Sequence, residues 1–150
     1  MSQNMSQKIT LIIITLWVGA LWAIGLVAYV LFKTLPNNHQ LAGNLAGQLF
    51  TVVRYIGMAS AFYLLIQRLI DYGTSSLKQA YFWAVLVMLL LVLAEHFGIQ
   101  PILAQLKADA MPADVMQSIF AERFGKWHGI ASVAYLVECL LGFVLVLKVR

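Results

Sequence analysis

The stretch ITLIIITLWVGALWAIGLVAYVLF, residues 9–32, decides the fold class of this chain. It contains no charged residue, and at about 1.5 Å per residue it is long enough to cross a lipid bilayer as a helix. A secretory signal would have a shorter apolar stretch followed by a small-residue cleavage site, whereas this stretch ends in Val30-Leu31-Phe32-Lys33. We therefore expect residues 9–32 to form a transmembrane helix that is retained in the protein.

The composition of the whole chain agrees with this expectation. Of the 150 residues, 62% are hydrophobic and only 11% are charged, whereas soluble proteins are about half apolar and a quarter charged. Three further apolar runs, at about residues 48–69, 79–100 and 127–147, are each long enough to span a bilayer. Backbone groups in lipid must be hydrogen-bonded internally, and no alternating strand pattern suggests a barrel. The sequence predicts an all-α, polytopic membrane four-helix bundle that forms a single domain over residues 1–150.

The segment between the third and fourth runs has the pattern of an amphipathic helix. Pro112 suits the first turn of a helix and Asp114 complements its start. Apolar residues then fall on one side: Val115, Met116, Ile119, Phe120 and Phe124. We expect a short helix over residues 113–124 that lies at the membrane interface.

The connections between the spans set the expected topology. Residues 33–47 contain Pro36 and two glycines and are expected to form the first loop, while Pro101 is expected to disrupt the end of the third span. Four spans place both termini on one side of the membrane. The Lys and Arg residues divide equally between the two sides, but acidic residues accompany those near the last long connection. We expect both termini to be cytoplasmic.

Charge and cysteine content limit the partners. The net charge of +4 comes from Lys and Arg residues that are scattered singly, so nucleic acid is not an expected partner. The single cysteine, Cys139, cannot form an intrachain disulfide. The expected partners are the lipid bilayer and, through faces of small residues such as those between Trp17 and Trp22, a second copy or another membrane protein.

Glu138 is the first candidate functional residue, because it lies about 15 Å inside the fourth span, where an ionised carboxylate is costly. It is either a protonated side chain that bonds a neighbouring helix or a group that binds a proton, an ion or a ligand. Ser132 and Tyr135 share a helical stripe with His128 and Cys139, which helix packing explains. No orienting acid or oxyanion hole supports a serine-hydrolase site.

A second set of candidates is expected near the long-loop end of the spans. Arg54, Glu95 and His96 should lie at about the same depth as His128. They either form a polar cluster at the mouth of the bundle or decorate the interface. Two histidines on neighbouring helices could also ligate haem iron, as in haem b, or a transition metal.

The chain also resembles a known family. Trp17-Val18-Gly19-Ala20-Leu21-Trp22, followed by Ala46-Gly47-Gln48-Leu49-Phe50, Pro101 and Phe124-Gly125-Lys126-Trp127-His128-Gly129, is similar to a family of small bacterial membrane proteins of unknown function. That family resembles the eukaryotic transmembrane protein associated with cisplatin resistance and, remotely, the copper-resistance D proteins. The resemblance implies a four-helix fold in the bacterial inner membrane. It also implies that His128 is a candidate ligand of haem or metal, with His96 as its partner.

Three functions remain open from the sequence. The first is a non-enzymatic accessory, binding or small-solute handling component of the membrane. The second is a haem- or metal-binding redox protein that uses His128 and His96. The third is a proton-coupled transporter that uses Glu138.

Overall fold

The computed structural model describes residues 2–149, and within that range the chain forms helices and turns without strands. Its α-helices are α1 (Ser2–Thr34), α2 (His39–Tyr72), α3 (Ala80–Leu93), α4 (Gln100–Ala110) and α5 (Ala121–Leu147). Short helical turns accompany them: η1 (Gly73–Lys78), η2 (Ala94–Ile99) and η3 (Val115–Gln117). Four continuous helical stretches are long and apolar enough to cross a membrane, with α3, η2 and α4 together forming the third. The predicted all-α four-helix membrane fold is confirmed.

The outer surface of these helices is apolar. Large side chains in the middle of the spans, including Leu16, Ile66 and Leu140, are more than half exposed. Such an apolar outer surface is suited to contact with lipid, while the helices pack against one another inside the bundle. The protein is therefore an integral membrane protein.

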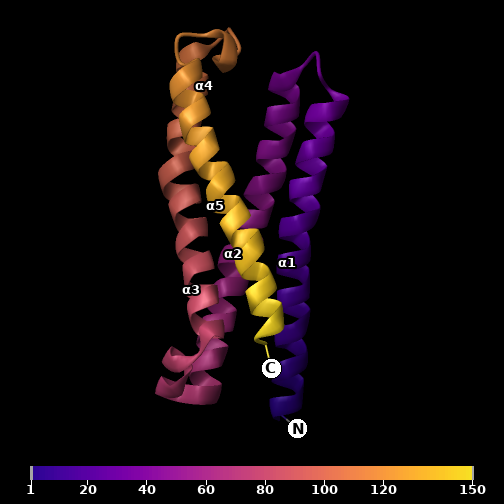
Figure 1. The fold of residues 1–150 in the computed structure, drawn as a ribbon, viewed down its shortest axis with the longest axis vertical. Coiled ribbons are helices and arrows are strands. Elements are labelled where there is room, and N and C mark those ends of the chain that lie inside the picture. The colour runs from indigo at the N-terminus through magenta and orange to yellow at the C-terminus, as the bar shows by residue number, and fades with distance from the viewer. Residues whose placement is uncertain (1, 150) are drawn as a thin grey trace.

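The four spans form a ring in which α1 and α3 each pack against both α2 and α5. Figure 1 shows that the α1–α2 pair and the α4–α5 pair are spread apart at the end opposite the two termini. We call the end with the termini and η1 the closed half. The end with the connections at residues 35–38 and 111–120 is the open half.

The main apolar core fills the closed half and the middle of the bundle. Its fully buried members come from all four spans and include Leu21, Leu64, Val85, Met88 and Leu145. A second, smaller cluster lies in the open half between α4 and α5. It contains Leu106, Ala110 and Val115. Neither cluster lies between α2 and α4 in the open half.

The first loop is shorter than expected. Residues 33–47 were predicted to be a loop, but α1 continues to Thr34 and α2 begins at His39. Asn38 starts α2 because its side-chain oxygen accepts a hydrogen bond from the backbone N–H of Leu41 at 3.0 Å. The glycines that suggested a loop are tolerated within the first turns of this helix.

The third span is longer than expected, because the helix passes through Pro101 and ends at Ala110. The π-turn η2 precedes the proline, and the N–H of Gln100 bonds to the carbonyl of Glu95, five residues earlier. This wider turn accommodates a residue without an N–H and with a bulky ring. Pro101 then occupies the first turn of α4 instead of ending the span.

The prediction of an amphipathic helix over residues 113–124 is wrong in its extent. Only Val115–Gln117 is helical before α5 begins at Ala121, and it is a single 3-10 turn. Side chains compete with the helix here: Asp114 accepts from the N–H of Met116, and the Ser118 hydroxyl both donates to the carbonyl of Val115 and accepts from the N–H of Phe120. These local bonds favour a compact turn.

Candidate functional site

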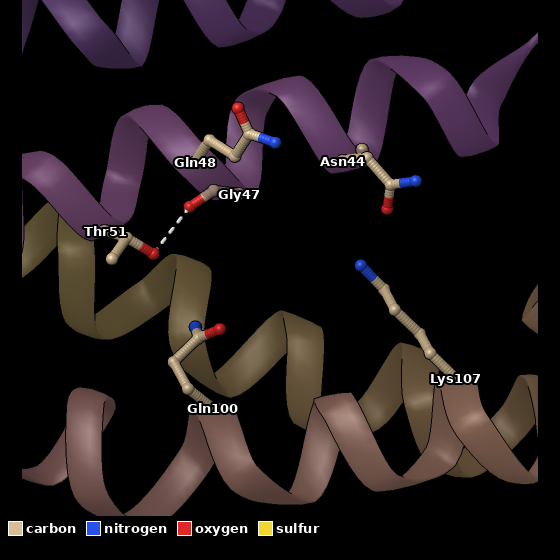
Figure 2. A pocket seen from close by; sticks show the side chains of 7 residues that line it. Asn44, Gly47, Gln48, Thr51, Gln100 and Lys107 are labelled. Atoms are coloured by element: carbon tan, nitrogen blue, oxygen red, sulfur yellow. Dashed lines mark hydrogen bonds between the residues drawn. The ribbon is translucent and has the colours of Figure 1, made fainter.

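A polar groove of about 510 Å³ lies between α2 and α4 in the open half. Its lining residues are Gly43, Asn44, Gly47, Gln48 and Thr51 of α2 and Gln100 and Lys107 of α4. Figure 2 shows the Lys107 side chain extending from α4 toward Asn44 on the facing helix. The groove therefore offers amide, hydroxyl and ammonium groups within a protein whose remaining surface is largely apolar.

Helical periodicity brings these side chains together. Asn44, Gln48 and Thr51 are spaced by four and three residues, so they share one face of α2. Gln100 and Lys107 are two helical turns apart and share the facing side of α4. Sequence analysis missed this groove because it assigned residues 33–47 to a loop. The signal was the three-to-four-residue spacing of polar side chains, which continues to Arg54.

Arg54 lies one turn deeper than Thr51 on α2. Its Nη2 donates a hydrogen bond to the Thr51 hydroxyl at 3.0 Å, and that hydroxyl donates in turn to the carbonyl of Gly47 at 2.8 Å (Figure 2 shows the second bond). The Arg54 side chain is only 7% exposed, and its Nε has no hydrogen-bond partner. A buried guanidinium is thus hydrogen-bonded to a residue that lines the groove.

Two buried carboxyl groups complete this centre. Glu95 of η2 is 2% exposed and Glu138 of α5 is 1% exposed. Both interact electrostatically with Arg54 and with each other, and each has an Oε1 atom without a hydrogen-bond partner. We call Arg54, Glu95 and Glu138 the charged triad. Its members come from three different spans, so only the folded bundle brings them together.

The indole of Trp17 on α1 packs against α2 at Gly57, about one helical turn from Arg54. Trp17 is completely buried, and its Nε1 has no hydrogen-bond partner. The ring packs on Gly57, where a Cβ atom would lie 2.9 Å from the indole nitrogen and 3.5 Å from the Cγ2 of Val92. The indole therefore packs where α1, α2 and α3 come together, between Arg54 and the closed half.

The predicted stripe on α5 divides into different environments. The Tyr135 hydroxyl donates to the backbone carbonyl of Leu21 on α1, and its ring meets Phe50 edge-on with centroids 4.9 Å apart. Ser132 is exposed and donates to the carbonyl of His128 within its own helix at 2.9 Å. Tyr135 therefore joins helices near the triad, whereas Ser132 faces outward.

The two candidate histidines have different neighbours. His96 packs against Tyr55 of α2, with ring centroids 5.1 Å apart. His128 is exposed and stacks on Phe124 of its own helix, with centroids 5.8 Å apart. Within the described part of the chain, no group of three or more His, Cys, Asp and Glu side chains is placed to hold a metal. Haem or metal binding by His96 and His128 stays a prediction.

A second cavity, of about 480 Å³, lies in the closed half. Its polar side chains bond to one another: Gln67 donates to Ser6 at 2.6 Å and to Asp71 at 3.1 Å. The guanidinium of Arg68 lies 4.4 Å from the ring centroid of Tyr81. These groups have partners, in contrast to the orphaned atoms of the charged triad.

Four apolar spans around a buried charged centre define a polytopic membrane protein with an ionisable interior. The family described as domain of unknown function (DUF4149) matches residues 12–112, and the chain belongs to it. That match includes the groove, Arg54 and Glu95, whereas Glu138 lies beyond it. No curated protein and no solved structure matches the chain. The similarities to the cisplatin-resistance protein and to the copper-resistance D proteins stay predictions.

Proposed function

We propose that this chain is a non-enzymatic membrane protein that binds a small anionic solute in the groove between α2 and α4. The observation that carries the proposal is the placement of a cation among amide groups: Lys107 lines the groove together with Asn44, Gln48 and Gln100. Cationic and amide N–H groups form charge-assisted hydrogen bonds with carboxylates and phosphates. The lining side chains include no carboxylate to oppose such a ligand.

The depth of the groove favours a water-soluble ligand over a lipid. Lys107 lies close to the end of α4 at Ala110, whereas Gln100 is ten residues from that end, or about 15 Å deeper. Polar side chains at such depth are costly unless they line a water-filled cavity. A lipid tail would favour apolar side chains, whereas the lining residues other than Gly43 and Gly47 carry amide, hydroxyl or ammonium groups.

Equilibrium binding of phosphate and acetate to the purified protein tests this proposal. Lys107→Gln should weaken binding of the preferred anion by about tenfold or more, because a hydrogen bond to a charged group contributes about 1.5–3 kcal/mol. Lys33→Gln is the matched control, since Lys33 is exposed in the last turn of α1, at the same end of the bundle, and does not line the groove. Equal affinities in both variants, or binding only of anionic lipid in nanodiscs, would contradict the proposal.

We also propose that the protein resides in the bacterial inner membrane with both termini in the cytoplasm and that it self-associates. The position of both termini at one end of the bundle supports a common side for them (Figure 1). The broad apolar outer surface is compatible with a second copy as well as with lipid. Reporter fusions at the two termini test the orientation, and cross-linking in membranes tests self-association.

A further inference from the structure

The charged triad has a net negative charge when all three of its members are ionised. Arg54 contributes one positive charge, and Glu95 and Glu138 contribute two negative charges. All three side chains are at least nine-tenths buried. An uncompensated charge in such a low-dielectric interior is strongly unfavourable. The interior therefore favours a state with one charge fewer.

The neighbouring groups offer no second cation. Arg54 is the one cation that acts on both Glu95 and Glu138 among the described residues. The α1 span contributes the indole of Trp17, which does not titrate. Titratable neighbours from the other spans are Tyr55 of α2, His96 of η2 and Tyr135 and Cys139 of α5. Tyrosine and cysteine are neutral at neutral pH, so they do not offset a negative charge, and His96 is not among the charges that act on either carboxyl group.

We propose that Arg54, Glu95 and Glu138 form a proton-binding site inside the membrane, in which the two carboxyl groups share one proton. A proton from water forms an O–H bond with one carboxylate, and the other carboxylate stays ionised and balances the guanidinium. Binding is reversible and involves no redox change. The site requires no bound solute, so it stands apart from the proposed anion binding.

Among the described residues, no hydrogen bond fixes the proton on either carboxyl group. Each carboxyl group keeps an oxygen without a hydrogen-bond partner, so either can hold the proton. Both interact with the same guanidinium and with each other. Arg54 is hydrogen-bonded to Thr51, which lines the groove, and this places the triad next to a route from water.

Infrared spectroscopy of the full-length protein in lipid at neutral pH counts the protons directly, because a protonated carboxyl group has its own carbonyl band. The wild-type protein should show one such buried group. Glu138→Gln and Glu95→Gln should each abolish the band, although one carboxyl remains, because that carboxylate then balances Arg54. Arg54→Met should double the band, because neither carboxylate retains a partner. Glu122→Gln is the matched control, since Glu122 is an exposed residue of α5 and its loss should leave the band unchanged.

Each alternative to the shared proton predicts a different number of protonated carboxyl groups in these proteins. A proton fixed on Glu138 as a structural hydrogen-bond donor would leave the band in Glu95→Gln, and that result would overturn the shared site. A wild-type protein without the band would show that another cation balances the triad. Isotopic labelling of glutamate in the wild-type chain assigns the band without any substitution, so the proposal remains testable if a variant does not fold. A band that does not shift with the glutamate label would overturn it.

Discussion

The closed and open halves of the bundle use the same kind of helix in different ways. In the closed half, apolar side chains from all four spans meet in one core. In the open half, α2 and α4 face each other across a polar groove, and the apolar cluster there joins only α4, α5 and the turn between them. The face of each helix, rather than its overall hydropathy, therefore decides whether two spans pack or separate.

Glycine residues show the same contrast at the level of single contacts. A Cβ at Gly57 would lie 2.9 Å from the Trp17 indole, and one at Gly142 would lie 3.1 Å from the Cγ1 of Val18. At Gly47, in the groove, a Cβ would meet nothing within 4 Å. Small residues therefore permit close helix contact in the packed part of the bundle, as is common in membrane proteins. In the groove a glycine leaves open space.

The largest effect on stability is expected from Trp17→Ala. The indole is completely buried against α2 and α3, so its removal leaves a cavity and should lower the free energy of unfolding by about 3–5 kcal/mol. Trp127→Ala is the matched change in the open half, where the indole is only partly buried beside the smaller cluster. Its effect should be clearly smaller in a reversible detergent-denaturation measurement. Equal losses would mean that the two halves are packed alike.

The spans could be predicted well from the sequence because a long apolar run has few stable structures other than a membrane-spanning helix. It also selected Arg54, Glu95 and Glu138 as candidates, since charges within such runs are rare. It placed Arg54 and Glu95 near the mouth, whereas in the structure both are buried in the interior, as Glu138 is, and both carboxyl groups act electrostatically on Arg54. Depth could not be predicted because the first loop and the end of the third span were both misplaced.

Contacts between spans were beyond the sequence for a physical reason. Trp17 and Gly57 lie on different helices, and only the rotation of each helix decides that they meet. A Cβ at Gly19, two positions after Trp17, would meet nothing within 4 Å, so the expected packing role of the motif is not located at this glycine. The π-turn at Ala94–Ile99 was likewise unexpected, and it leads directly into α4, which lines the groove.

A smaller effect is expected from alanine at two glycines of α2. Gly57→Ala should lower the free energy of unfolding by about 1–3 kcal/mol, because the added methyl group overlaps the Trp17 indole and the backbone of a helix shifts only slightly. Gly47→Ala should leave stability unchanged or raise it by up to about 1 kcal/mol, because alanine favours a helix and the site is open. Thermal unfolding followed by circular dichroism compares the pair. The contrast between the halves would be lost if Gly47→Ala were the more harmful change.

The smallest effect on folding, but a clear chemical difference, is expected from cysteines placed on α2. Gln48→Cys lies in the groove and Phe62→Cys on the outer face, and both positions are exposed in the folded protein. Such exposed substitutions usually change stability by less than about 0.5 kcal/mol. A water-soluble maleimide should label Gln48→Cys because the groove admits water, and it should not label Phe62→Cys because lipid covers that face.

The wild-type chain supplies the internal control for this labelling, since its single cysteine, Cys139, is buried and should stay unmodified until the protein unfolds. Labelling of Gln48→Cys that equals that of Phe62→Cys would show that the two surfaces share one solvent. In that case the divergence of α2 and α4 would be a lipid-filled gap, and the anion-binding proposal would fail with it. Selective labelling that phosphate or acetate slows would instead place the bound anion in the groove, because only a ligand there protects position 48 and leaves the outer face unaffected.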